Sequence, residues 1–180
     1  MWKRNWMIGV LLLGLFACDD SNVNLDNPRN VSATFVVDGG APVVVGSKGQ
    51  GEMGLEPGAH SIKVEVEGEV IADTTIEIRG GGILHSGAQT YLIWRQLYGL
   101  QNDRETLLNE KWTEFDSLRA FGDFRIYPKT QIFIEQNWDL GLGEDLPDEE
   151  VMYISEDFKI QSKIFRAPDF VATYRDMAGQ

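Results

Sequence analysis

Apolar and polar residues alternate along residues 30–84, and this pattern predicts short β-strands buried on one face. A period of two places successive side chains on opposite faces of a strand. The Asp38-Gly39 and Pro57-Gly58 dipeptides separate the apolar stretches and are typical of tight turns. Residues 30–84 are therefore predicted to form a small antiparallel β-sandwich. Its core-facing positions are expected at Val31, Ala33, Phe35, Val37, Ile62, Val64, Val66, Ile76 and Ile78.

The pattern changes in residues 85–180, where aromatic residues become frequent. A buried strand is predicted at 91–94. Further strands are predicted at 151–154 and 158–165, and a hairpin over 124–135, turning at Lys129-Thr130. A spacing of three or four residues predicts one amphipathic helix. That helical stripe consists of Leu108, Trp112, Phe115 and Leu118.

The predicted fold class is mostly β with one main helix, in two modules. The antiparallel β-sandwich of residues 30–84 is followed by an aromatic-rich α+β module over 85–180, with Gly80-Gly81-Gly82 near the boundary. Residues 18–29 are rich in Asn and Asp. They are predicted to be a flexible tether, because they bring too little apolar area to offset ordering.

Residues 1–17 have the three parts of a secretion signal. Lys3 and Arg4 give the positive start, residues 7–16 give an apolar stretch too short to span a bilayer, and Ala17 is a small residue at the end. Cys18 follows, and it is the single cysteine of the chain. No internal disulfide can therefore form, and the fold must be held by its core.

Leu15-Phe16-Ala17-Cys18 resembles the lipobox of bacterial lipoproteins, with Phe16 in place of the usual small or β-branched residue. The resemblance implies cleavage before Cys18 and its modification by acyl chains such as palmitate. Several chains together give stable membrane anchoring. Asp19 and Asp20 fit either inner-membrane retention or export to the cell surface, as these signals are known in lipoproteins. We expect an envelope protein, with the outer membrane favoured.

The first module also resembles PEGA-type and similar immunoglobulin-like modules of bacterial envelope proteins. The resemblance rests on residues 35–39, which read Phe-Val-Val-Asp-Gly, and on residues 55–64, which read Leu-Glu-Pro-Gly-Ala-His-Ser-Ile-Lys-Val. It covers about 50 residues, and it implies a role in spacing or adhesion. The 85–180 module resembles no family in this way.

Motifs that carry chemistry are not found in the sequence. His60 and His85 are the two histidines, and neither stands in a nucleophile, zinc or phosphate-binding pattern. The sequence therefore predicts no catalytic residue, no metal site and no cofactor. The acidic stretch 139–150 does not match an EF-hand, and a different calcium site remains an open alternative. A net charge of −12 argues against nucleic-acid binding.

The contact surface is expected in the second module. Trp138 precedes the acidic stretch, while Tyr127 and Phe133 are assigned to the outer face of the predicted hairpin, where they either pack against another element or form a contact patch. The function expected is that of a lipid-anchored envelope lipoprotein, a non-enzymatic binding or scaffold module for an envelope protein partner. The alternative is a surface glycan-binding lipoprotein, or a small glycan-processing enzyme that uses exposed aromatic residues and carboxylates.

Overall fold

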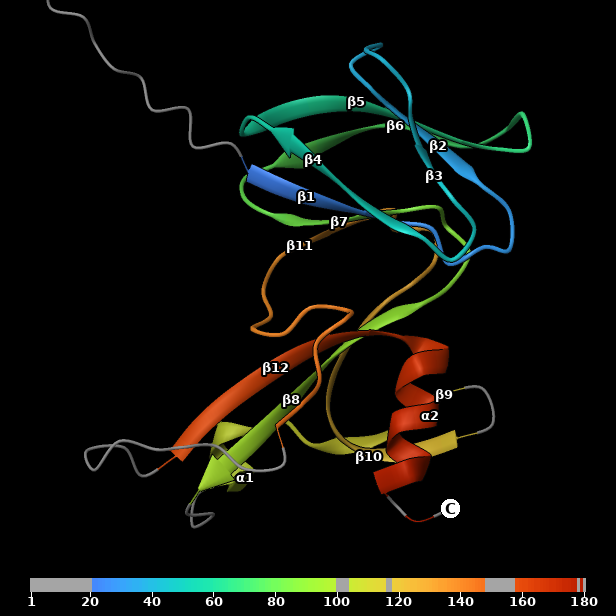
Figure 1. Ribbon diagram of the computed structural model, residues 1–180. Helices are drawn as coiled ribbons and strands as arrows, with labels where there is room; N and C mark the ends of the chain where they lie inside the picture. Colours follow the sequence, from blue (N-terminus) through green and yellow to red (C-terminus); the bar gives the residue numbers. More distant parts are fainter. Residues whose placement is uncertain (1–20, 100–103, 116–117, 148–157, 178, 180) are drawn as a thin grey trace, which may run out of the picture.

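The computed structural model describes residues 21–99, 104–115, 118–147, 158–177 and 179. Within these ranges the chain forms three four-stranded sheets and one helix longer than a turn (Figure 1). The predicted fold class, mostly β with one main helix, is confirmed, although the helix occupies a different segment. The predicted strand at 151–154 lies outside the described residues.

The first sheet, on one outside of the stack, has the strand order β3-β2-β5-β6, with antiparallel neighbours throughout. The predicted turn after β2 is confirmed, because Asp38 and Gly39 have φ values of 51° and 65°. The predicted alternation is confirmed as well, since Phe35, Ile62 and Val64 are buried. The strands are β2 (Ala33–Val37), β3 (Val43–Val45), β5 (Gly58–Val66) and β6 (Glu69–Ile78).

The middle sheet has the order β11-β7-β1-β4, and it joins segments that are far apart in the sequence. β1 runs parallel to β7 and antiparallel to β4. The predicted tether is therefore wrong for residues 21–29. Val23 and Leu25 are fully buried. Two apolar side chains at strand spacing are therefore enough to order this segment when β4 and β7 pair with it on either side. The strands are β1 (Ser21–Asp26), β4 (Gln50–Leu55), β7 (Gly82–His85) and β11 (Phe133–Glu135).

The third sheet has the antiparallel order β12-β8-β10-β9. The predicted helix through Trp112 and Phe115 is wrong, because β9 and β10 form a hairpin there, and α1 (Arg104–Leu107) is a single turn. Phe115 pairs with Leu118 across the hairpin, so a spacing of three residues brings both to one face. The strands are β8 (Tyr91–Gly99), β9 (Lys111–Phe115), β10 (Leu118–Tyr127) and β12 (Phe158–Arg166).

The predicted hairpin over 124–135 is also wrong, because its two halves join different sheets. β10 pairs with β8 and β9, whereas β11 pairs with β7 of the middle sheet. The chain crosses between the two sheets through residues 128–132. The strands predicted at 91–94 and 158–165 are confirmed as parts of β8 and β12.

The main helix is α2 (Ala167–Met177), which the sequence pattern did not single out. Its start carries the helix signals of Pro168 and Asp169 in the first turn. Phe170 is fully buried, with the rings of Trp94, Phe115, Phe124, Phe165 and Tyr174 at centroid distances of 4.9–5.7 Å. The helix therefore closes the outer face of the third sheet through an aromatic core.

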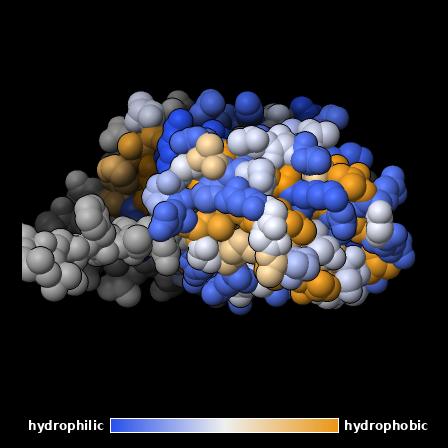
Figure 2. Space-filling model, turned by 90° about the horizontal axis from the view of Figure 1, so that it is seen from above, coloured by the Kyte–Doolittle hydropathy of each residue, from blue (hydrophilic) through white to orange (hydrophobic). Residues whose placement is uncertain are grey.

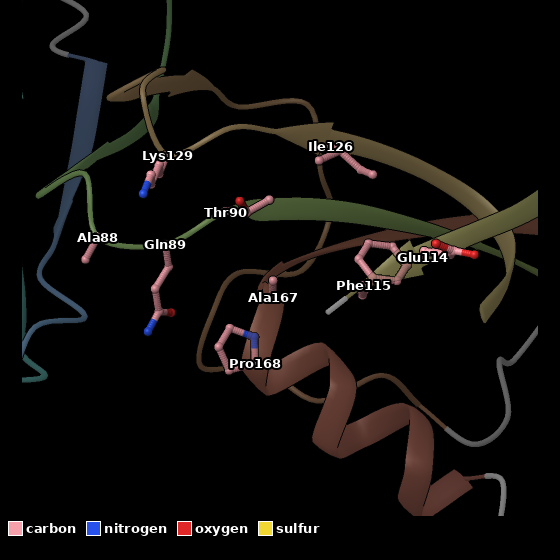
Figure 3. Close-up of a pocket in the computed structure, with 9 residues that line it drawn as sticks. All are labelled: Ala88, Gln89, Thr90, Glu114, Phe115, Ile126, Lys129, Ala167 and Pro168. Atoms are coloured by element: carbon pink, nitrogen blue, oxygen red, sulfur yellow. The ribbon is translucent and has the colours of Figure 1, made fainter. Parts of the chain in front are cut away.

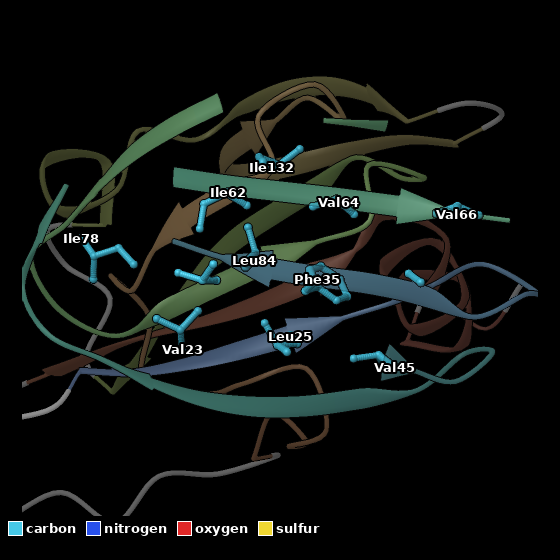
Figure 4. Packing of buried hydrophobic residues seen from close by; sticks show 12 residues of the cluster. Val23, Leu25, Phe35, Val45, Ile62, Val64, Val66, Ile78, Leu84 and Ile132 are labelled. Carbon is cyan, nitrogen blue, oxygen red and sulfur yellow. The ribbon is translucent and has the colours of Figure 1, made fainter. Parts of the chain in front are cut away.

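The sheets stack in three layers, with α2 on the far side of the third (Figure 1). One face of the middle sheet supplies Val23, Leu25 and Leu84 to the core shared with the first sheet (Figure 4). Its other face supplies Ile83 and Ile134 to a second core with β8 and β12. The middle sheet thus takes strands from both halves of the chain and packs against both neighbours.

The outer face of the first sheet is turned to solvent. Seen from above, hydrophilic residues cover most of it, with small hydrophobic areas between them (Figure 2). Lys63 and Glu65 form a surface ion pair on β5, with 2.5 Å between Nζ and Oε1. Across the described residues, no helix combines the length and the apolar character needed to cross a bilayer.

Candidate functional site

The three aromatic residues predicted to form a contact surface are not exposed together. Trp138 and Tyr127 are 8% and 5% exposed and belong to the core between the middle and third sheets. Phe133 is half-buried and packs against the core between the first and middle sheets. The predicted contact surface is therefore wrong, because these side chains pack between neighbouring sheets.

A different pair of rings is exposed, on the hairpin of β9 and β10. Trp112 is 58% exposed and Phe121 is 45% exposed, with their ring centroids 5.4 Å apart. The Arg119 guanidinium carbon lies 4.8 Å from the Trp112 ring centroid. We call Trp112, Phe121 and Arg119 the aromatic patch. Sequence reasoning placed Trp112 on a buried helical stripe, so it missed this surface.

A hollow of about 320 Å³ lies where the third sheet extends past the start of α2 (Figure 3). We call it the end groove. Its volume is at the lower end of the range common for ligand pockets. In Figure 3, Lys129 and Gln89 stand on one side, and Phe115 and Glu114 on the other. The groove is lined by Ala88, Gln89, Thr90, Glu114, Phe115, Ile126, Lys129, Ala167 and Pro168.

The position at which α2 begins creates the end groove. The Ala167 N–H donates to the Thr90 carbonyl at 2.9 Å, which fixes the first turn beside β8. The Phe170 ring of the helix covers Phe124. In contrast, Ile126, two residues further along β10, remains 45% exposed. Two residues along a strand return to the same face. The groove is therefore the uncovered end of an otherwise buried apolar face.

Gln89 supplies an unusual polar atom to this groove. Its Oε1 is buried and has no hydrogen-bond partner in the structure. A buried acceptor that lacks a donor costs free energy, and a bound N–H or O–H group would remove that cost. Lys129 and Glu114 add one cation and one anion at the rim. The groove can thus receive an apolar side chain, with the Gln89 side chain beside the attached backbone.

A second hollow, of about 240 Å³, lies beside Trp138. Asn24 and Gln50 of the middle sheet line it on one side, and residues 141–144 on the other. Glu144 folds back on this loop, where its Oε2 accepts the Gly141 N–H at 2.5 Å. The Glu144 carboxylate thus already accepts a hydrogen bond from the backbone of its own loop.

The acidic stretch was an open alternative for calcium. In the part of the chain that the structure describes, no three His, Cys, Asp or Glu residues gather closely enough to hold a metal ion. Asp139 accepts the N–H and the hydroxyl of Ser162, both at 2.8 Å, and so holds the loop to β12. Residues 148–150 lie outside the described part, as does the predicted lipidation site Cys18.

A buried polar cluster joins the middle and third sheets. Asp26 is fully buried and accepts hydrogen bonds from Arg166 and from the Tyr91 hydroxyl. The hydrogen bond to Asp26 raises the pKa of Arg166, while burial, followed by the Asp26 charge, raises the pKa of Tyr91. Both groups are therefore held in their protonated forms. Their hydrogen bonds to Asp26 connect the third sheet to the middle sheet.

His85 lies against this cluster, with its ring centroid 4.5 Å from that of Tyr91. The Gly87 N–H donates to Nδ1 at 3.1 Å, so Nε2 carries the proton and donates to the Gln131 carbonyl at 2.7 Å. Burial lowers the pKa of His85 to about 4. The neighbouring Ser86 hydroxyl donates to Asn27 Oδ1 at 2.9 Å, so this His-Ser dipeptide is used in structural contacts.

His60 forms an ion pair at the surface of the first sheet. Its Nδ1 lies 2.7 Å from Asp38 Oδ2, and its Nε2 lies 2.7 Å from the Glu56 carbonyl. The hydrogen bond to Asp38, and then the one to the Glu56 carbonyl, raises the pKa of His60. This side chain ties the turn after β2 to the start of β5.

No family model matches the chain, and no curated protein is similar to it. The end groove and the aromatic patch are therefore the surfaces from which a function must be argued.

Proposed function

We propose that this protein is a lipid-anchored envelope lipoprotein that binds an envelope protein partner and catalyses no reaction. The end groove carries the proposal. It combines an exposed apolar side chain, Ile126, with a buried acceptor, Gln89 Oε1, that lacks a hydrogen-bond partner. A segment of polypeptide meets both needs at once, through one apolar side chain and the N–H of its backbone.

The anchor is supported by the sequence of residues 15–18 and by where the fold begins. β1 starts at Ser21, three residues after Cys18. Three residues span at most about 10 Å, so the folded part would stand close to the lipidated residue. β1 begins on the left in Figure 1, whereas α2 and β9 lie on the right, so the groove is on the other side of the fold from the start of β1.

The anchor is tested by Cys18→Ala. We expect the wild-type chain to incorporate labelled palmitate and to remain with membranes after a high-salt wash. The variant should lose the label and appear in the soluble fraction. A variant that keeps its membrane association, or a wild-type chain that takes up no label, would contradict the anchor.

The groove is tested by photo-crosslinking from position 129 at its rim, in the full chain in native membranes. We expect one discrete protein adduct, which Ile126→Asp and Gln89→Leu should reduce at least tenfold. Val44→Asp is the matched control, because Val44 is 64% exposed and lies on β3 of the first sheet. An adduct that survives Ile126→Asp in a folded chain, or that Val44→Asp removes equally, would rule out the groove.

A glycan ligand is the second candidate, and the aromatic patch favours it. The apolar face of a sugar ring can lie on an exposed Trp112 ring, beside which Arg119 can donate to hydroxyl groups. Retention on immobilised polysaccharides should then be lost in Trp112→Ala. Trp138→Ala is unsuitable for this test, because Trp138 is part of the core.

A further inference from the structure

β9 is the last strand of its sheet, and one hydrogen bond fixes which of its backbone groups face outward. The Phe121 N–H donates to the Tyr174 hydroxyl at 3.3 Å. That N–H therefore points away from β9, and Phe121 with its register partner Trp112 forms a non-hydrogen-bonded pair. The N–H and C=O of Trp112 consequently point away from β10, toward the edge of the sheet, where no further strand follows among the described residues.

The same orientation recurs two residues along the strand. Glu114 therefore also directs its N–H and C=O outward, whereas Lys111, Thr113 and Phe115 bond to β10. An edge strand with free backbone groups is a template for another strand. The side chains of Trp112 and Glu114 share one face with Phe121 and Arg119, so an added strand would place its own side chains next to Trp112 at the edge of the aromatic patch.

We propose that β9 pairs with β9 of a second copy of this chain, antiparallel and about a two-fold axis at Thr113. In this register Trp112 lies opposite Glu114 of the second copy, and Glu114 opposite its Trp112. Those are the residues whose backbone groups face outward, so four hydrogen bonds form between the copies. A symmetric pairing of this kind is the commonest way in which identical chains associate.

The side chains select this register over its neighbours. Centring the axis on Trp112 would oppose Glu114 to Glu110, and centring it on Glu114 would oppose two identical carboxylates, which is destabilising. The axis at Thr113 opposes no like charges and pairs all five residues of β9. It also brings the two Trp112 rings to diagonal positions, where aromatic side chains reach one another.

Burial of the patch gives the association its driving force. Trp112 is 58% exposed in the single chain and lies beside the new strand, while Phe121, 45% exposed, lies one strand further in and packs against Trp112. A contact through one short strand is small compared with stable dimer interfaces. We therefore expect a weak dimer in solution and a populated one where anchoring confines the chains to a membrane. Only this membrane enhancement rests on the proposed function.

Single cysteines test the register directly. Opposed residues of a non-hydrogen-bonded pair have Cα atoms about 4.5 Å apart, within disulfide range. After mild oxidation, Thr113→Cys should give a disulfide-linked dimer at least tenfold more abundantly than Lys111→Cys or Trp112→Cys. In one arm, the chain is oxidised in native membranes. In the second, purified arm, the chain also carries Cys18→Ser and is oxidised at rising protein concentration. The purified arm keeps the dimer testable if the anchor fails.

Backbone substitution supplies the matched control. Glu114→Pro removes an outward N–H without removing a bond to β10, and it should abolish the cross-linking of the Thr113→Cys chain. Glu114→Gln should preserve that cross-linking, and circular dichroism confirms folding in both. The dimer is overturned if the Thr113→Cys chain remains monomeric in both arms, with its free thiol verified by labelling after unfolding. It is also overturned if cross-linking is equal at all three positions, or if Trp112→Cys dominates, which indicates another register.

Discussion

Arg166 and Asp26 are 140 positions apart in the sequence, yet the Arg166 Nη2 and Nε lie 2.5 and 3.0 Å from the two Asp26 carboxylate oxygens. The Asp26 side chain is 1% exposed and that of Arg166 is 17% exposed. The pair joins the end of β12 to the end of β1. It therefore links the third sheet to the middle sheet at a place where the Asp26 carboxylate is shielded from bulk water.

Breaking this pair should strongly destabilise the fold. Arg166→Met leaves the buried Asp26 carboxylate without its countercharge, and removal of one partner of a buried pair costs about 3–5 kcal/mol. Urea unfolding of the variant measures the loss. Lys63→Met is the control, because the Lys63–Glu65 pair is solvent-exposed and contributes far less than a buried pair. An equal loss of unfolding free energy in the two variants would contradict a stabilising role for the buried Arg166–Asp26 pair.

Phe170 should be the most sensitive position in α2. Phe170→Ala removes a fully buried ring that contacts five other rings, and a Phe→Ala change in a core costs about 3–5 kcal/mol. Met177→Ala, at the 62% exposed end of the same helix, should stay within about 0.5 kcal/mol of wild type. Thermal unfolding compares the two, and a mild effect of Phe170→Ala would show that α2 is dispensable.

His85 should make the fold sensitive to mild acid. Its pKa is lowered to about 4 in the folded chain, against 6.5 as the ordinary value, so the unfolded chain binds the proton more readily. The stability it contributes is complete above pH 6.5 and is lost as the pH falls toward 4. Urea unfolding at about pH 7.5 and about pH 5 should show a loss that His85→Gln reduces. The same loss in the variant would assign it to other groups.

His60 should act in the opposite direction on the first sheet. Asp38 raises the pKa of His60, so its contribution is complete below pH 6.5 and lost as the pH rises through the raised value. The same bond lowers the pKa of Asp38, so the carboxylate's contribution is lost only in stronger acid, below its ordinary 3.8. His60→Gln should therefore lower the melting temperature at about pH 5.5 and have little effect at about pH 9. A difference that does not change with pH would exclude the ion pair as its cause.

Gly81 and Gly82 show why a glycine run is ambiguous in sequence. From the sequence, the run near residue 80 predicts a boundary between two modules. A Cβ on Gly82 would come within 2.5 Å of the Ile134 carbonyl, and one on Gly81 within 2.7 Å of Gln136 Oε1. These glycines permit β7 and β11 to lie close together, a requirement that depends on a strand about 50 residues away.

The sequence by itself determined what depends on neighbours along the chain. Alternation over residues 33–37 and 62–66, with an Asp-Gly turn, is a local property, and the structure confirms it. The secretion signal and Cys18 are likewise read locally and remain predictions. Tertiary structure decided what depends on distant partners. Val23 and Leu25 become a buried strand because β7 and β4 receive them, and Trp138 is buried because the layers close over it. Whether Trp112 or Ile126 is exposed follows from where β9 ends the sheet and α2 begins, and no local pattern encodes either.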